Sequence, residues 1–310
     1  MVSQEEEKNE DKLRVLILWN TGGSLAEVCD WLNKNGHESV IIMRSEYDKY
    51  GHTSRVSGSV MVDSARDFYS TCIKYLKEWN PTHIHVSTII RALVLARQYQ
   101  RRTPIVFEYH GGEIRSRKKP HPEVSLADIV AVSTNDLLKY GDIWLDRPIP
   151  SWFEYKGGRV QGTALMTYHP NYHKDQREMA KKWCEERGVD LTIIDRSVDA
   201  PIPYEEMPEF LSKYEYYLEF KGFPELSLSK NAIEAIACGC KVVADAYPNE
   251  IIDNYKVVTS KDYYELYKSM QKPRFTLRRA LRLLISYPKW LVGRLGVKPL
   301  KEGEKYADGF

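Results

Sequence analysis

Residues 226–243 read LSLSKNAIEAIACGCKVV and contain the start and stop signals of a short helix. Ser229 is a favoured N-cap residue, so the helix is predicted to begin at Lys230. Gly239 is a typical residue to end it, and the β-branched residues that follow predict a strand. A turn, a capped helix and a strand in this order form the building unit of a parallel α/β domain.

Glu234 lies in the second turn of this predicted helix. A helix N-terminus attracts anions, because its first N–H groups lack partners and the helix dipole is positive there. A carboxylate one turn inside can accept hydrogen bonds from the two adjacent hydroxyls of a ribose, each worth roughly 1.5 to 3 kcal/mol. The alternative is that Glu234 only forms a surface pair with Lys230 across one turn.

The alternation of strands and helices extends from this segment over most of the chain. In the first half, predicted strands at 14–19, 39–43, 83–87, 105–109 and 129–133 enclose helices at 24–35, 63–79 and 89–101. In the second half, strands at 164–168, 191–195, 216–219 and 241–246 alternate with helices at 175–187, 205–213 and 230–238. This pattern predicts parallel sheets with helices on both faces.

Residues 146–158 (DRPIPSWFEYKGG) interrupt the alternation with proline, glycine and aromatic residues, so we place a domain boundary there. The predicted parts are a disordered tail at 1–12, Rossmann-like domains at 13–155 and 156–271, and a basic amphipathic segment at 272–310. The fold class is therefore α/β, with two Rossmann-like doubly wound domains facing a cleft, where the carboxyl ends of such strands bind ligands.

The composition excludes several classes of protein. The chain has 310 residues, of which 43% are hydrophobic, enough for two cores. Its formal net charge is only +2, whereas a nucleic-acid binder usually has a clearly basic domain. Five cysteines are too few for a disulfide framework. The N-terminus is polar and acidic, and no apolar run approaches the ~20 residues that span a bilayer, so we expect a cytoplasmic protein or one that lies on a membrane.

Residues 233–243, IEAIACGCKVV, resemble the LEAMACGxPVV signature of the retaining GT-B glycosyltransferases of the glycogen synthase and mannosyltransferase type (glycosyl transferases group 1). Three further segments occur in that family's order: the Gly22-Gly23 turn with GHESVIIM after its helix, the strand THIHVS, and FEYHGGE after the fourth strand. The resemblance implies the GT-B fold, with an acceptor domain at 13–155 and a nucleotide-sugar donor domain at 156–271.

The resemblance also implies roles for individual residues. In this family the glutamate that matches Glu234 holds the donor ribose, and the histidine that matches His110 faces the transferred sugar. The turn that matches Gly22 and Gly23 approaches the diphosphate. We therefore assign His110 to catalysis.

The sequence departs from the family pattern at two places. Retaining members carry Glu-x7-Glu, whose first glutamate contacts the sugar hydroxyls; the matching position here is Leu226, and the nearest carboxylate is Glu225, which we also assign to catalysis. The usual Arg and Lys pair that neutralises the diphosphate is missing. The corresponding stretch, TYHPNYHKDQ, offers Lys174, with Lys221 and Lys230 as other candidates. The residues predicted to bind the donor are Gly22, Gly23, Lys174, Ser229, Lys230 and Glu234.

His110 ends a predicted strand, where a neutral imidazole can donate to a sugar hydroxyl or a phosphate oxygen; without the resemblance it would be interpreted as a structural histidine. The loop after it contains Glu113 and a basic run that begins at Arg115. A basic loop suits an anionic acceptor, so we assign Glu113 and Arg115 to acceptor binding. The alternative is that these charges are only solvated.

Other motifs have simpler interpretations. His83 and His85 alternate on one strand and share a face, but no third ligand has suitable spacing for a metal, so we interpret them as packed strand residues. One C-x-C motif, Cys238-Gly239-Cys240, is equally weak as a metal site. A serine hydrolase is disfavoured because there is no G-x-S-x-G motif.

The predicted activity is transfer of a sugar from a nucleotide-sugar donor to an acceptor hydroxyl, with retention of configuration. The protein would position the reactants and stabilise the leaving diphosphate with helix N-termini and lysines, so we expect no metal and no cofactor. Two alternatives remain open: a nucleotide-sugar epimerase of the same fold, and a non-catalytic protein that binds nucleotide sugars as a scaffold.

The C-terminal run 272–301 contains nine Lys or Arg and no Asp or Glu. Its leucines recur at helical spacing, and Arg274, Arg278 and Arg282 form a separate basic row, which is typical of a helix in a membrane interface. We predict that it holds the protein on an anionic membrane, where a lipid-linked or glycan acceptor would be found. The alternative is that this segment packs on the first domain.

Overall fold

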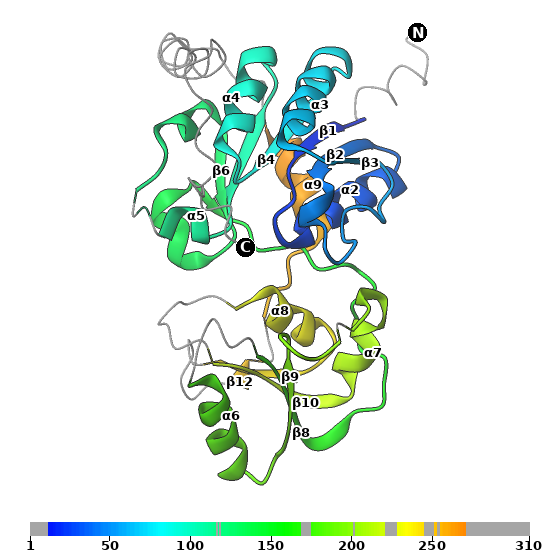
Figure 1. The fold of residues 1–310 in the computed structure, drawn as a ribbon, viewed down its shortest axis with the longest axis vertical. Coiled ribbons are helices and arrows are strands. Elements are labelled where there is room, and N and C mark those ends of the chain that lie inside the picture. Colours follow the sequence, from blue (N-terminus) through cyan, green and yellow to red (C-terminus); the bar gives the residue numbers. More distant parts are fainter. Residues whose placement is uncertain are drawn as a thin grey trace. The chain divides into compact units, whose positions relative to one another are not determined.

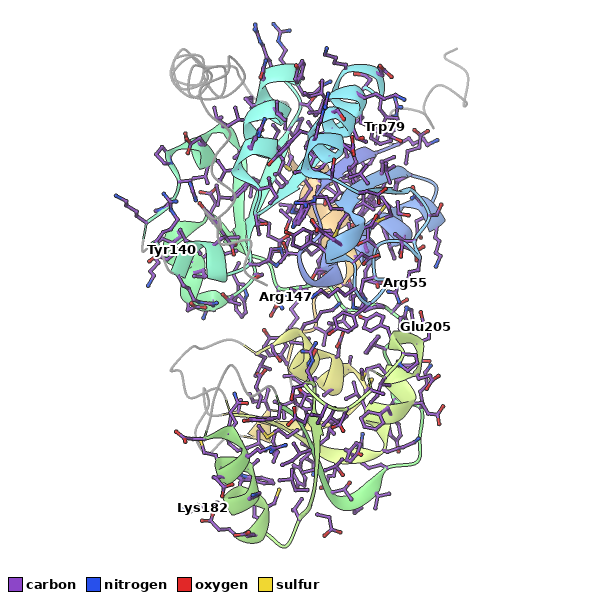
Figure 2. All side chains as sticks on the ribbon, in the orientation of Figure 1. Arg55, Trp79, Tyr140, Arg147, Lys182 and Glu205 are labelled. Carbon is purple, nitrogen blue, oxygen red and sulfur yellow. The ribbon has the colours of Figure 1, made fainter. Side chains whose placement is uncertain are left out.

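The structure is a computed structural model that describes residues 12–115, 117, 119–168, 175–200, 202–220, 228–244, 251–252 and 255–270. The chain divides into two compact units (Figure 1). Unit 1 contains residues up to 133, then 137–145, and again from 260 on; unit 2 contains 134–136 and 146–259. Within each unit, side chains fill the space between the sheet and its helices (Figure 2). None of the helices in the described ranges is both long and apolar enough to cross a membrane.

Unit 1 is built on a seven-stranded sheet in the order β3-β2-β1-β4-β5-β6-β7, in which every pairing is parallel. Its strands are β1 (Arg14–Leu18), β2 (Glu38–Arg44), β3 (Ser59–Val62), β4 (His83–Ser87), β5 (Ile105–Tyr109), β6 (Ile129–Val132) and β7 (Ile143–Trp144). Its α-helices are α2 (Ser24–Lys34), α3 (Ala65–Glu78), α4 (Ile90–Tyr99), α5 (Gly112–Arg115) and α9 (Ser260–Ser269). The strand order reverses between β1 and β4, which places the crossover helices on both faces: α2 packs against α9, and α3 against α4 (Figure 1).

Unit 2 is built on a five-stranded sheet in the order β12-β11-β10-β8-β9. The strands β8 (Val160–Tyr168), β9 (Asp190–Asp195), β10 (Tyr214–Glu219) and β11 (Lys241–Ala244) are parallel, and β12 (Ile251–Ile252) is antiparallel to β11. The helices α6 (Gln176–Glu185), α7 (Met207–Ser212) and α8 (Lys230–Ala237) connect them. The strand order reverses between β8 and β10, so the carboxyl ends of these two strands mark the expected ligand edge.

The apolar runs of the sequence explain these sheets. In β1, Val15, Leu16, Ile17 and Leu18 are all fully buried, as expected for a central parallel strand that is covered on both faces. The structure confirms the predicted fold class of two doubly wound Rossmann-like α/β units. The cleft between them stays a prediction.

The last described helix differs from the predicted domain division. The prediction assigned residues up to 271 to the second domain, whereas α9 belongs to unit 1. Tyr263 and Tyr267 of α9 are fully buried, and the Tyr267 hydroxyl lies 2.9 Å from Nδ1 of His85 on β4. Burial of these two rings against the first sheet therefore decides to which unit α9 belongs.

Candidate functional site

Helix α8 has the predicted caps at both ends. The Ser229 hydroxyl accepts a hydrogen bond of 3.3 Å from the Ala232 N–H, which satisfies one of the free donors of the first turn. At the other end Gly239 has φ = 84°, a left-handed value that suits glycine. Its N–H donates to Ile236 O, and the Cys240 N–H donates to Ala235 O, the pair of hydrogen bonds of a Schellman motif. The helix thus starts and ends where the sequence predicts.

Glu234 is buried in unit 2, with 4% of its surface exposed. Its Oε1 accepts a hydrogen bond of 2.7 Å from the Tyr204 hydroxyl and lies 3.6 Å from Lys230 Nζ. The pairing with Lys230 that was one alternative is therefore present, but it is a buried pair rather than a surface pair. Both of these contacts involve Oε1.

Aromatic rings surround this carboxylate. The ring of Tyr204 packs edge-on to Trp152 at 5.3 Å and lies 5.1 Å from Phe153. Burial raises the pKa of Glu234, and the opposing effects of Lys230, Tyr204 and Arg147 only partly offset this rise. Of these residues, Arg147 is labelled in Figure 2. An anion with a raised pKa gains from additional hydrogen-bond donors, such as the hydroxyls of a sugar.

A second carboxylate lies at the start of α8. Both oxygens of Glu219, the last residue of β10, lie 3.0 Å from the Ser229 N–H, and Glu219 is 8% exposed. Sequence reasoning missed this contact. It places a negative charge beside the helix N-terminus at which the sequence predicts the donor diphosphate.

Hydroxyl groups gather at the ligand edge of unit 2. The Tyr217 hydroxyl of β10 lies 2.6 Å from Thr167 Oγ1 of β8, and Asn231 Nδ2 donates to the same oxygen over 3.5 Å. Burial raises the pKa of Tyr217 well above its usual range. These residues were also missed, although they directly precede or lie within segments that the sequence singled out.

Two predicted site residues, Glu225 and Lys174, lie outside the described residues, as does the further candidate Lys221. Their assignments to catalysis and to the diphosphate stay predictions.

In unit 1 a glycine turn follows β1. Gly22 and Gly23 have φ values of 64° and 77°, and a Cβ on Gly23 would lie 2.7 Å from the His52 ring. Helix α2 begins directly after them at Ser24, whose fully buried hydroxyl has no hydrogen-bond partner among the described residues. The turn therefore requires glycine for its backbone, and its contact with a diphosphate stays a prediction.

Strained residues mark the point where the strand order of this sheet reverses. Trp19, after β1, has φ = 80°, and Thr88, after β4, has φ = 58°, which is unusual for a β-branched residue. The Thr21 hydroxyl joins the two segments: it lies 2.9 Å from Ser87 Oγ and 3.4 Å from Thr88 Oγ1. Sequence reasoning assigned no role to these hydroxyls.

His110 follows β5 and is 5% exposed. Its Nε2 lies 3.5 Å from Glu108 Oε2, and neither ring nitrogen makes a well-formed hydrogen bond within the described part of the chain. Glu113 Oε1 accepts from the backbone N–H groups of His110 and Gly111, so this carboxylate caps the turn. The guanidinium of Arg115 packs over Gly111. The predicted acceptor roles of Glu113 and Arg115 are not tested by these contacts.

The histidines of β4 have the packed positions that were predicted. His85 Nε2 lies 3.1 Å from Glu108 Oε2, and burial lowers the pKa of His83 to about 4. Among the described residues, no group of three His, Cys, Asp or Glu side chains is arranged to hold a metal ion. The expectation of a metal-independent protein stays a prediction.

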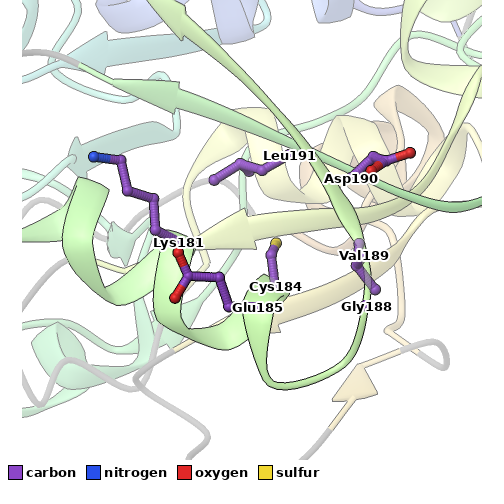
Figure 3. A pocket seen from close by; sticks show the side chains of 7 residues that line it. All are labelled: Lys181, Cys184, Glu185, Gly188, Val189, Asp190 and Leu191. Carbon is purple, nitrogen blue, oxygen red and sulfur yellow. The ribbon is translucent and has the colours of Figure 1, made fainter.

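A hollow of about 310 Å³ lies elsewhere in unit 2, between α6 and the start of β9 (Figure 3). It is lined by Lys181, Cys184, Glu185, Gly188, Val189, Asp190 and Leu191. This is the amino-terminal edge of the parallel sheet, opposite the edge that carries α8 and the hydroxyl groups. The hollow is therefore not the candidate site.

No protein-family model matches the chain, and no curated protein sequence matches it. Among solved structures, a putative UDP-N-acetylglucosamine 2-epimerase from Listeria monocytogenes is 13% identical, with 89% of each chain covered and a TM-score of 0.47. The spinosyn forosaminyltransferase SpnP is 15% identical over 92% of this chain and 98% of its own, with a TM-score of 0.43. The calicheamicin glycosyltransferase CalG4 is 12% identical over 75% and 79%, with a TM-score of 0.43. Similarity at this level does not establish a family, an activity or a substrate.

Proposed function

We propose that the chain is a glycosyltransferase in which unit 2 binds a nucleotide-sugar donor and Glu234 holds the donor ribose. The observation that carries the proposal is the geometry of Glu234. It is buried one turn inside a Ser-capped helix at the carboxyl edge of a parallel sheet, with Oε1 fixed by Tyr204. A fixed carboxylate oxygen beside a helix N-terminus suits a ribose joined to a diphosphate.

The remaining parts of the proposal follow from this donor. The sugar passes to an acceptor hydroxyl with retention of configuration, and His110 of unit 1 faces the transferred sugar. Helix N-termini and lysines stabilise the leaving diphosphate, without a metal. The acceptor is a glycan or a lipid-linked sugar, which the basic segment 272–301 reaches by binding the cytoplasmic face of an anionic membrane.

A panel of labelled UDP-, GDP- and ADP-sugars tests the proposal, with separate detection of transferred sugar, free sugar and epimerised sugar. Calorimetry with the bound nucleotide sugar then compares Glu234→Gln with the wild type. Loss of one charge-assisted hydrogen bond predicts a loss of about 1.5 to 3 kcal/mol, which is roughly tenfold to a hundredfold in affinity. Glu206→Gln is the matched control, because Glu206 is exposed near Tyr204 and should leave affinity unchanged. Equal affinity of wild type and Glu234→Gln would refute the ribose assignment.

One observation favours a second candidate, a non-catalytic protein that binds nucleotide sugars. Glu219 holds a carboxylate at the start of α8, where a transferase would neutralise the developing charge of the diphosphate. The same panel separates the candidates: binding without turnover supports the second, and an epimer as product indicates an epimerase.

A further inference from the structure

A buried polar cluster lies between β4, β5 and α9 of unit 1. Glu108 of β5 and His85 of β4 are fully buried. His85 pairs with Val106 in the sheet register, and Glu108 is two residues further along, so the two side chains share one face. Helix α9 covers this face with Tyr263 and Tyr267, which are also fully buried. Central parallel strands are normally apolar on both faces, so a buried carboxylate here requires specific partners.

The carboxylate of Glu108 has partners from three elements. Oε1 accepts from the Tyr263 hydroxyl over 3.3 Å, and Oε2 lies 3.1 Å from His85 Nε2 and 3.5 Å from His110 Nε2. His85 is fixed from its other side by the Tyr267 hydroxyl at 2.9 Å from Nδ1. The chain of contacts therefore runs from α9 through Glu108 to His110.

The charges of the cluster favour one form of the His110 ring. Burial raises the pKa of Glu108, but the facing His110 and His85 outweigh it and bring this pKa below its usual range, so the carboxylate is ionised. A carboxylate only accepts hydrogen bonds, which favours a proton on His110 Nε2. The distance of 3.5 Å is typical of a site whose hydrogen bonds shorten when a ligand binds. His110 Nδ1, which is buried and has no hydrogen-bond partner among the described residues, is then left as an acceptor.

We propose that Glu108 is a positioning residue for His110 and that α9, through Tyr263, fixes the orientation of this pair. The inference rests on the proposed function, in which His110 faces the transferred sugar. A helix that only completed the core would need no hydroxyl at position 263. Here the hydroxyl holds one oxygen of Glu108, which leaves the other oxygen to the two imidazoles.

Other groups around His110 do not replace Glu108. Glu113 accepts from the backbone N–H of His110, and Ser133 Oγ donates to its carbonyl oxygen over 3.4 Å, so both act on the main chain. The Arg115 guanidinium lies against Gly111. Glu108 is a charged side chain that faces the His110 ring directly, at 3.5 Å from Nε2.

The test is the tautomer of His110, measured from the ¹⁵N shifts of the full-length chain labelled at histidine. The chain has eight histidines, so the His110 signals are identified by their loss in His110→Gln. We expect the Nε2–H tautomer to dominate in the wild type and a mixture of tautomers in Glu108→Gln and Tyr263→Phe. Tyr264→Phe is the matched control on the same helix: Tyr264 stacks on His37 at 4.9 Å, outside the cluster, and its variant should match the wild type.

Activity gives a second readout. If sugar transfer is observed, Tyr263→Phe should lower kcat about tenfold or more and change KM little, because a displaced histidine affects the reacting geometry rather than donor binding. Unchanged His110 tautomers in both Glu108→Gln and Tyr263→Phe would overturn the inference. If Glu108→Gln does not fold, Tyr263→Phe alone decides in the same way. The tautomer measurement does not depend on turnover. Absence of sugar transfer would therefore count against the proposed function, and the positioning role of Glu108 would still be decided by the ¹⁵N spectra.

Discussion

Glu219→Gln should weaken the fold and strengthen diphosphate binding, two effects of opposite sign from one change. Both carboxylate oxygens of Glu219 lie 3.0 Å from the Ser229 N–H at the start of α8. The negative charge stabilises the helix by its interaction with the positive end of the helix dipole, and it makes a charge-assisted hydrogen bond. Replacing it by a neutral amide should lower the free energy of unfolding by about 1 kcal/mol.

The gain in binding follows from the distance between charges. A phosphate at the N-terminus of α8 would lie roughly 5 Å from this carboxylate, where two unit charges repel by about 3 kcal/mol at an effective dielectric constant of about 20. Solvent screening reduces this figure, so we expect a gain of roughly tenfold to a hundredfold in affinity for a nucleoside diphosphate. The affinity for the nucleoside without phosphates should stay the same.

Calorimetry with UDP, GDP and ADP and with the three nucleosides measures these affinities, and urea denaturation measures stability. Ser229→Ala is the control: it removes the helix cap, at a cost of about 1 kcal/mol, without changing a charge. It should lower stability to a similar extent and give no gain in diphosphate affinity. If Glu219→Gln loses stability but binds the diphosphate no more tightly than the wild type, the diphosphate does not lie at the start of α8.

Three further predictions concern stability and membrane binding. Gly239→Ala should lower the unfolding free energy by about 1 to 2 kcal/mol, because φ is 84° and the new Cβ would lie 2.5 Å from Arg159 Nη2; an unchanged urea midpoint would contradict this. Burial lowers the pKa of His83 to about 4, so the folded state binds fewer protons than the unfolded state, and up to about 3 kcal/mol of stability should be lost as the pH falls from about 6.5 to 4. In urea titrations, His83→Leu should lose less stability than the wild type as the pH falls. Identical pH profiles of stability for the two proteins would refute this prediction. The full-length chain should float with anionic vesicles at low salt, release at high salt and lose binding when truncated after Gln271, whereas equal binding to neutral vesicles would exclude an electrostatic anchor.

The sequence was most informative where the signal is local. The caps of α8 lie within eleven residues of each other, from Ser229 to Gly239, and both were predicted correctly. Helix α9 was not predicted to join the first unit, because nothing in SKDYYELYKS indicates which sheet its tyrosines cover. The strands β7 and β12 have only two residues each, too few to show a period, and were missed, as was the four-residue β3.

The polar contacts of the site were harder to predict than the fold. Glu108 and His85 are separated by 23 residues, and their contact depends on the register of β4 against β5. One signal was present: HIHVS and FEYH both place polar residues at alternate positions of strands that were expected to be buried. When two such strands are neighbours in a parallel sheet, their alternating polar residues predict a shared polar cluster. This rule can be applied to a sequence before its structure is known.

The return of α9 to unit 1 has a consequence for the order of synthesis. Unit 2 is an insertion within unit 1, because the chain leaves the first unit after residue 145 and re-enters it at 260. At 5–20 residues per second, the ribosome would complete α9 roughly 6 to 25 s after it completes β7. Until then Glu108 and His85 remain open to water on one face of a nascent sheet. The N-terminal half alone should therefore not mature into a stable protein, and a single cut between the two halves would leave the first one without α9.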